Sequence, residues 1–276
     1  MSQTALRSGA APSAPAKPRR SLQDMSTRSG VILFLVELVV VLALWQYLIG
    51  TLELVNPLFL PPPLETSQAL GDLLTSGELW PHAIAFMKGW FAGFGLAAIL
   101  GVLGGLLIGS SIAADRLTAP ILWTIYATPW LAYRPLSKAW FGFGLTPVIF
   151  LVFIAAVFPT LFNVSAGIRT TKRSLLNAGR IFGASRSVRY RRIVLPWTVP
   201  YIITGLRQSA VIATIALIVA EMTGPSVGMG ALIIFKANTF NTAESFAAIA
   251  LIVLWSVAMS QLIKIIGRIV APWSVQ

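Results

Sequence analysis

Residues 172–207 read KRSLLNAGRIFGASRSVRYRRIVLPWTVPYIITGLR, a basic stretch that runs directly into an apolar one. Lys172–Phe182 can form a short helix, Gly183 interrupts it, Ala184–Arg192 can form a second, and Pro196 opens the next element. Two short helices joined by a glycine turn can lie on a membrane surface and dock on a partner. The simpler alternative is a basic loop that only fixes the orientation of the chain.

The composition of the remaining chain is that of a membrane protein. Of 276 residues, 56% are hydrophobic and 11% are charged, and the mean hydropathy is +0.79, whereas a soluble domain carries about 25% charged residues. There is no cysteine and the one histidine is His82, which excludes disulfides, thiolate sites and multi-histidine metal sites. The formal net charge of +12 is explained by basic cytoplasmic loops, and no exposed basic domain indicates nucleic-acid binding.

The apolar material falls into stretches long enough to cross a bilayer, because about 20 helical residues span its hydrocarbon core. We therefore expect an all-α membrane domain over residues 31–276, preceded by a disordered basic cytoplasmic tail at residues 1–30 rather than by a cleaved signal peptide. The six expected spans are at about 31–50, 83–110, 117–142, 145–167, 201–222 and 246–270.

The third expected span is unusual because prolines interrupt it. Pro120, Pro129 and Pro135 fall within it, and Arg134 and Lys138 lie near its outer end. Prolines in a membrane helix free backbone groups that a neighbour or a water-lined path must satisfy, and such breaks are frequent in transporters.

The charge of the loops predicts the topology. Residues 51–82 contain four acids and no Lys or Arg, whereas residues 167–200 contain eight basic residues and no acid. The positive-inside rule therefore places both termini and the 167–200 segment in the cytoplasm, which requires an even number of spans. The eight basic residues are Arg169, Lys172, Arg173, Arg180, Arg186, Arg189, Arg191 and Arg192.

The second expected span has a stripe of small residues, which allows another helix backbone to approach closely in lipid. We interpret this stripe as a packing surface rather than a chemical site. Its members, four residues apart, are Gly89, Gly93, Ala97, Gly101, Gly105 and Gly109.

The spacing within the 172–207 segment resembles the EAA loop of bacterial ABC-importer permeases. That loop has an acid, two small residues, three of any kind, Gly, nine of any kind, then Ile-x-Leu-Pro. The matching residues here are Asn177-Ala178-Gly179, Gly183, Ile193 and Leu195-Pro196. Outside the loop, the nitrate/sulfonate/taurine-type branch is matched by Leu60-Pro61-Pro62-Pro63, Gly77-Glu78-Leu79-Trp80, Trp140-Phe141-Gly142-x-Gly144 and Ala220-Glu221-Met222.

The resemblance implies a type I ABC importer permease fold with six transmembrane helices and cytoplasmic termini, in the bacterial inner membrane. It also implies that the segment 172–196 docks an ATPase. Asn177 replaces the family's acid and Gly179 its second alanine, so any salt bridge from that acid to the ATPase is lost. The expected docking residues are Asn177, Ala178, Gly179, Phe182, Gly183, Ala184, Ser185, Ile193, Leu195 and Pro196.

A permease of this kind performs no chemistry and works with partners. The chain has no Gly-x-x-x-x-Gly-Lys-Ser/Thr phosphate loop, so we expect it to bind no cofactor and ATP and Mg to bind to a separate ATP-binding cassette ATPase dimer. The other expected partners are a periplasmic or lipid-anchored substrate-binding protein, a second permease copy and membrane lipid, with no nucleic acid. The branch implies a small, anionic solute of the sulfonate, taurine, nitrate or organic acid type, although it also includes importers of a pyrimidine precursor of thiamine, which are not anion carriers.

Candidate residues of the translocation pathway are Trp130, Arg134, Lys138, Arg207 and Glu221. Arg134 and Lys138 share one face if the helix continues past Pro135. They could attract an anionic substrate at the outer mouth of the pathway, or they could extend into water at the membrane interface, as long basic side chains do.

Two other classes of protein fit the composition less well. A membrane-embedded enzyme needs paired acids or a nucleophile with its base, but Glu37, Glu221 and Glu244 lie on different expected helices. A secondary transporter or channel without an ATPase would show inverted repeats or several functional charges within the membrane, and the sequence shows no internal repeat. Copurification of a nucleotide-binding subunit would exclude both.

Overall fold

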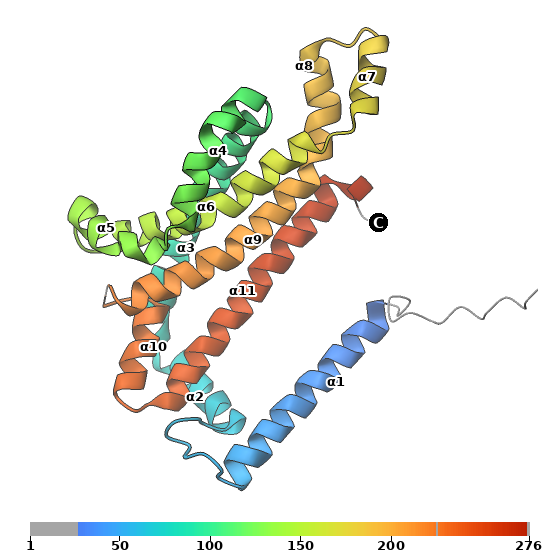
Figure 1. Cartoon of the computed structure of the whole chain (residues 1–276). Coiled ribbons are helices and arrows are strands. Elements are labelled where there is room, and N and C mark those ends of the chain that lie inside the picture. The colour runs from blue at the N-terminus through green and yellow to red at the C-terminus, as the bar shows by residue number, and fades with distance from the viewer. Residues whose placement is uncertain (1–26, 225, 275–276) are drawn as a thin grey trace, which may run out of the picture.

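The computed structural model describes residues 27–224 and 226–274, and this part of the chain is helical with short connections (Figure 1). The expected tail at residues 1–30 lies almost entirely outside the described residues. The α-helices are α1 (Thr27–Trp45), α2 (Pro63–Ser76), α3 (Leu79–Gly109), α4 (Ile112–Ala127), α5 (Arg134–Phe141), α6 (Leu145–Arg169), α7 (Arg173–Ile181), α8 (Arg186–Arg189), α9 (Leu195–Met222), α10 (Met229–Asn238) and α11 (Thr242–Val270).

Five helical segments of the described chain are long and apolar enough to cross a membrane. They correspond to the first, second, fourth, fifth and sixth expected spans, and several extend beyond the expected bounds. The segments are Ile32–Thr51, Leu79–Gly109, Leu145–Arg169, Arg186–Met222 and Thr242–Val270.

The third expected span, residues 117–142, is broken, as its prolines predict, and consists of α4, a short turn and α5. Helix α4 ends at Ala127, Thr128 is extended with φ −74° and ψ 127°, and a 3₁₀ turn at Trp130–Tyr133 leads into α5. The cause is Pro129, whose ring disfavours the helical conformation for the residue before it and which has no N–H to donate. By contrast, Pro120 lies inside α4 and Pro135 in the first turn of α5, so neither ends a helix.

The glycine stripe of α3 is where this helix meets α6, as its spacing predicts. A Cβ added at Gly101 would lie 2.9 Å from the carbonyl oxygen of Val157, and one added at Gly105 would lie 2.7 Å from that of Leu161. The two backbones are therefore too close for any side chain between them. This contact builds the buried centre of the protein around α3, α6 and α9.

Helices α6 and α9 are joined by buried hydroxyl groups. Ser209 donates to the carbonyl of Ala156 at 2.6 Å, and its oxygen lies 2.7 Å from that of Thr160. On the other side of α9, the indole N–H of Trp90 donates to the Thr214 hydroxyl at 2.9 Å. Hydrogen bonds within a bundle satisfy groups that lipid could not.

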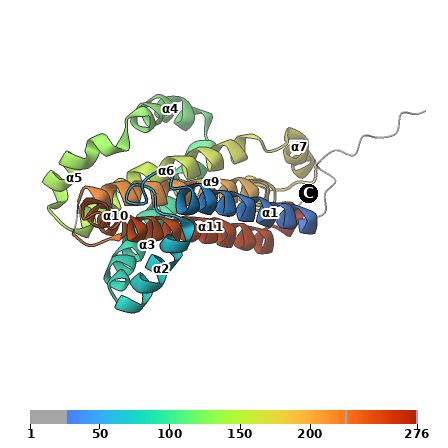
Figure 2. The same ribbon diagram turned by 90° about the horizontal axis from the view of Figure 1, so that it is seen from below.

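Both described ends of the chain lie at the end of the molecule where α7 and α8 project (Figures 1 and 2). The opposite end is formed by α2, α10 and the last turn of α1 (Figure 1). Helix α1 stands apart from the bundle and its side chains from Ile32 to Leu44 are exposed. It approaches α11 where the rings of Trp45 and Phe246 lie 6.2 Å apart.

Helix α10 is an element that the sequence did not predict, because it lies within a presumed loop. Its backbone is held to α9 by Glu221, whose Oε2 accepts from the N–H of Gly230 at 2.9 Å. The preceding turn is held to α3, because the N–H of Gly228 donates to Nδ1 of His82 at 3.1 Å. These contacts fix α10 against the end of α9 and the beginning of α3.

Candidate functional site

Helices α7 and α8 form a hairpin that extends beyond the ends of α6 and α9 (Figure 1). The turn between them requires Gly183, which has φ +73° and nothing within 4 Å of an added Cβ. The glycine is therefore needed for its left-handed backbone and not for a close approach. Ser185 begins the second helix, because its hydroxyl accepts from the N–H of Val188 at 3.4 Å.

The tip of this hairpin is apolar. Ile181 is 83% exposed and Phe182 is 87% exposed, directly before the glycine turn. Phe182 was among the expected docking residues and Ile181 was not, although its place beside Phe182 in the sequence is a usable signal. Tyr190 lies at the base of the hairpin, where its hydroxyl is 3.2 Å from that of Ser110.

The other expected docking residues are divided between the two arms of the hairpin. Asn177 and Ala178 lie on α7, with the Asn177 side chain exposed. A Cβ on Gly179 would lie 3.1 Å from the Ile193 side chain, so the arms approach closely at this point. Ala184 is in the turn, and Leu195-Pro196 begins α9.

The second arm of the hairpin is continuous with a long membrane helix. Helix α8, a π-helical turn at Tyr190–Val194 and α9 form one uninterrupted helical segment of 37 residues, Arg186–Met222. At about 1.5 Å per residue it is about 55 Å long. One helical segment therefore joins the hairpin to the core of the bundle.

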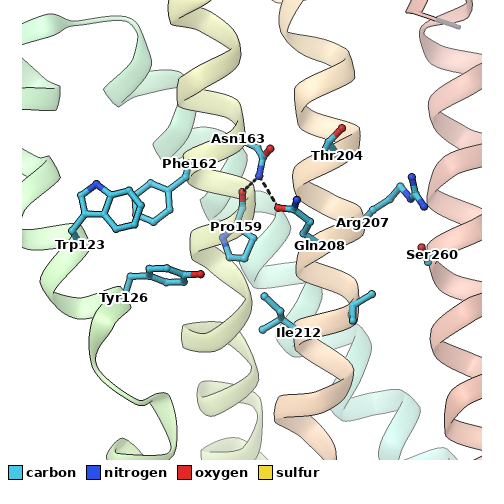
Figure 3. Close-up of a pocket in the computed structure, with 11 residues that line it drawn as sticks. Trp123, Tyr126, Pro159, Phe162, Asn163, Thr204, Arg207, Gln208, Ile212 and Ser260 are labelled. Atoms are coloured by element: carbon cyan, nitrogen blue, oxygen red, sulfur yellow. Dashed lines mark hydrogen bonds between the residues drawn. The ribbon is translucent and has the colours of Figure 1, made fainter. Parts of the chain in front are cut away.

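An open groove of about 630 Å³ lies on one face of the bundle (Figure 3). Helices α4, α6, α9 and α11 all contribute to it. Aromatic rings from α4 and α6 form one side, where Trp123 and Phe162 stack with centroids 4.4 Å apart. The lining residues are Trp123, Tyr126, Pro159, Phe162, Asn163, Thr204, Arg207, Gln208, Val211, Ile212 and Ser260.

The polar part of the groove lies along α6 and α9. The Asn163 amide donates to the carbonyl of Pro159 at 2.7 Å and to Gln208 at 2.9 Å (Figure 3). Arg207 extends from α9 toward α11, and its Nε is buried with no hydrogen-bond partner among the described residues (Figure 3). Arg207 was an expected pathway residue. Asn163 and Gln208 were not, although amides within apolar spans are a signal in the sequence.

Arg134 and Lys138 line a second, smaller cavity of about 70 Å³ between α5, α6 and the end of α9. The helix does continue past Pro135, so both cations are on α5 and reach the same cavity. None of the residues that line it is an acid, and neither cation has an ion pair in the described chain.

The remaining two pathway candidates lie outside both cavities. Glu221 is 1% exposed and packs against Gly228 and Gly230 beneath α10. Trp130 is in the 3₁₀ turn before α5 and packs against the buried core. The structure thus separates the five candidates into a groove with Arg207, a cavity with Arg134 and Lys138, and two residues that pack in the interior. No group of three or more metal-ligating residues occurs in the described ranges.

The sequence from residue 97 to residue 275 matches the family described as binding-protein-dependent transport system inner membrane component. The chain is 30% identical over 244 residues to the taurine transport system permease protein TauC of Escherichia coli (strain K12), covering 86% of this chain and 87% of TauC. It is 31% identical over 202 residues to the nitrate import permease protein NrtB of Leptolyngbya laminosa, covering 73% of this chain and 72% of NrtB.

The fold is similar to that of solved ABC importers. An inward-facing conformation of the MetNI methionine ABC transporter contains a chain that superposes with a TM-score of 0.60 at 16% sequence identity. The superposition covers 70% of this chain and 98% of that one.

Proposed function

Because this chain belongs to the family of binding-protein-dependent transport system inner membrane components, we propose that it forms the pathway through which an ATP-driven importer moves a small anionic solute. It is an ABC importer permease, a non-catalytic subunit with several membrane-spanning helices in the inner membrane. The observation that supports an anionic solute is Arg207 in the groove, whose Nε has no hydrogen-bond partner among the described residues.

The charges on the two cavities favour an anion. Arg207 lines the groove, and Arg134 and Lys138 line the smaller cavity, with no acid on either lining. A cation inside a membrane protein is costly unless it is paired or serves a ligand. Taurine and nitrate, which the two similar permeases transport by name, are small molecules with an anionic group.

A second permease copy is the partner that the open groove requires. Asn163 and Gln208 lie within membrane-spanning helices on an uncovered face, and polar groups in a span normally face protein or water rather than lipid. A second copy against this face would enclose the groove as a pathway between protomers. Helix α1, which stands apart from its own bundle (Figure 1), offers a second apolar surface for that contact.

We further propose that the chain crosses the membrane six times, with both termini in the cytoplasm and a membrane domain from residue 31 to residue 276. The five continuous spans are joined by a broken third crossing at residues 112–141, made of α4, the 3₁₀ turn and α5. Both described ends lie toward the same end of the molecule as the basic hairpin (Figures 1 and 2), which supports an even number of crossings.

The hairpin of α7 and α8 is the proposed docking element for an ATPase dimer that binds ATP and Mg. Closure of that dimer would move the hairpin, and the continuous segment Arg186–Met222 would transmit the movement toward α10. A loaded substrate-binding protein would act at the opposite end of the molecule. Both partners thus bias one two-state helical core.

The importer proposal is tested by its partners. The chain is expressed with an affinity tag in its native host, and the membranes are solubilised and purified. We expect a nucleotide-binding subunit to copurify in stoichiometric amount, and substrate-binding protein to stimulate the ATPase activity of the complex in proteoliposomes. A permease that purifies alone and transports a solute without ATP would be a secondary transporter or channel.

The role of Arg207 is tested with Arg207→Gln, with Arg207→Lys as the variant that keeps the charge. In proteoliposomes with the partners, we expect uptake of the anionic solute to fall at least about tenfold in the glutamine variant, the effect of about 1.4 kcal/mol. The lysine variant should retain more uptake than the glutamine variant, because it keeps the positive charge. Equal uptake by wild type and Arg207→Gln at equal expression would exclude an anion site in the groove.

A further inference from the structure

The base of the hairpin contains a cavity of about 280 Å³ that the proposed transport function does not use. It lies where the cytoplasmic ends of α3 and α6 meet α7, α8 and the start of α9. Its polar lining consists of Ser110, Thr171, Arg180, Arg186, Arg189 and Tyr190.

The charge in this cavity is of one sign. Arg180 comes from α7, and Arg186 and Arg189 come from α8, so three guanidinium groups converge from two helices. None of the three has an ion pair within residues 27–224 and 226–274. Asp115 of α4 does not line the cavity and is paired with Arg169.

A buried hydroxyl independently indicates a missing ligand. Thr171 is 6% exposed, and its Oγ1 has no hydrogen-bond partner among the described residues. A buried hydroxyl without a partner is unfavourable, and most such groups in proteins are satisfied. A ligand that accepts from Thr171 and from several guanidinium groups would satisfy the whole lining.

The chemistry of the lining selects the ligand. Guanidinium groups bind phosphate oxygens in pairs of parallel hydrogen bonds. The Tyr190 hydroxyl, which accepts from the Ser110 hydroxyl, can donate its own proton to a remaining oxygen. The cavity lies at the cytoplasmic ends of two membrane-spanning helices, at the depth of lipid head groups, where basic pockets between helices bind anionic lipids.

We propose that this cavity binds a phosphate group, either the head group of an anionic membrane phospholipid or free inorganic phosphate. The bound phosphate joins α7 and α8 to the ends of α3 and α6. It therefore sets the position of the hairpin relative to the membrane, on the side away from the exposed tip that docks the ATPase. The inference does not depend on which solute is transported.

The test compares two double substitutions with the same change in charge. Arg186→Gln with Arg189→Gln removes two cations from the cavity. Arg191→Gln with Arg192→Gln removes two exposed cations from the same segment that do not line it. Thr171→Val is a third variant, which keeps the charge and shape and removes only the buried hydroxyl.

The purified complex with its ATPase is stripped of lipid and titrated with phosphatidylglycerol, phosphatidylcholine or inorganic phosphate, and bound ligand is counted by native mass spectrometry. We expect the cavity variant to lose at least about tenfold in affinity for the phosphate-bearing ligand, as loss of charge-assisted hydrogen bonds would give. The Arg191/Arg192 variant should bind the ligand with the affinity of wild type. The affinity of Thr171→Val should lie between those of wild type and the Arg186/Arg189 variant.

The source of the phosphate follows from which titration responds. If phosphatidylglycerol binds less tightly to the cavity variants and inorganic phosphate does not bind, the ligand is a lipid head group. If inorganic phosphate binds and its affinity falls in the cavity variants, the ligand is the free anion. Equal losses of affinity in both double variants would overturn the proposal, because the cations would then act only by general attraction. Unchanged binding of both ligands in the Arg186/Arg189 and Thr171 variants would also overturn it, because the cavity would then not be the binding site.

Discussion

Lys236 of α10 and Glu78, 158 positions earlier in the chain, form an ion pair with 2.8 Å between Nζ and Oε2. The ammonium group also lies 2.5 Å from a carboxylate oxygen of Glu244, at the start of α11. Lys236 is 6% exposed, whereas both acids are partly open to solvent. One lysine thus holds together the outer ends of α3, α10 and α11.

Removal of this lysine should destabilise the outer end of the protein. Lys236→Met leaves two neighbouring carboxylates without a counter-charge, and we expect a loss of about 2 kcal/mol, less than for a fully buried pair because the acids are hydrated. Glu78→Gln should reduce the stability less than Lys236→Met does, since Glu244 remains to pair with Lys236. Thermal unfolding in detergent measures both, with Glu65→Gln, an exposed acid without an ion pair in the described chain, as the control.

The same ion pairs predict a pH dependence. Burial lowers the pKa of Lys236, but the two carboxylates outweigh burial and the net shift is upward. A raised pKa in the folded state means that this stabilisation is complete below the ordinary lysine value of about 10.4 and is lost above it. The difference in stability between wild type and Lys236→Met should therefore be the same at pH 7 and pH 9. A difference that shrinks over this range would contradict the charged state assigned to Lys236.

Gly183 should be required for coupling rather than for insertion. Gly183→Val places a β-branched residue at φ +73°, a conformation that such residues rarely adopt, so the hairpin should distort and ATPase copurification should fall. Gly183→Asn is the matched control, because asparagine tolerates the left-handed region. Expression and membrane insertion of both variants should be normal. A valine variant with full ATPase association and transport would exclude the docking role of the hairpin.

Docking of the ATPase should depend on both the charge and the apolar tip of the hairpin. Attraction by the basic residues is screened by salt, so association in detergent should weaken from low to high ionic strength. Ile181→Ser with Phe182→Ser should weaken it at every salt concentration, because these side chains are exposed apolar surface in the free chain. An affinity independent of salt would mean that the tip dominates and that the charges only set topology.

The cavity of Arg134 and Lys138 should serve the anion before it reaches the groove. Arg134→Gln with Lys138→Gln should lower uptake while ATPase association and expression stay normal. The alternative is that both side chains only extend into interfacial water, and uptake kinetics would then be unaltered. Because the two cations line the same small cavity and no acid lines it, we expect the loss of uptake.

The contact between α3 and α6 should tolerate no side chain at its centre. Gly101→Ile would force atoms against the Val157 carbonyl and should prevent stable folding. Gly95→Ala, on the same helix but with nothing within 4 Å of the added Cβ, should be neutral or slightly stabilising. Yield of monodisperse protein in detergent measures the difference. Normal yield of the isoleucine variant would contradict the close packing.

Sequence patterns predicted the features that arise from local chemistry. Runs of apolar residues predicted the five continuous spans. Small residues four apart predicted the surface between α3 and α6, and Gly183 predicted the hairpin turn. The break in the third span was anticipated from its prolines, but not that Pro129 alone ends a helix. Three prolines look alike in the sequence, whereas only Pro129 follows a residue that the structure leaves extended.

Features that depend on contacts between distant segments could not be predicted. Helix α10 is short, and its position depends on His82, Glu221 and the acids around Lys236, which come from three other elements. The groove forms where Asn163 of α6 meets Gln208 of α9. The separation of the pathway candidates also follows from packing. Arg207 and Glu221 are both on α9, but Arg207 lines the groove whereas Glu221 is buried beneath α10.

The continuity of α8 with α9 restricts the length of the chain between Arg189 and Leu195. Each residue added to or removed from a helix turns everything beyond it by about 100°, and the π-helical turn at Tyr190–Val194 already accommodates an irregular residue spacing. A deletion of one residue there would swing the hairpin to another side of the bundle and separate its tip from its docking partner. Substitutions in this segment change the strength of a contact, but a change in its length changes the direction in which the whole hairpin points.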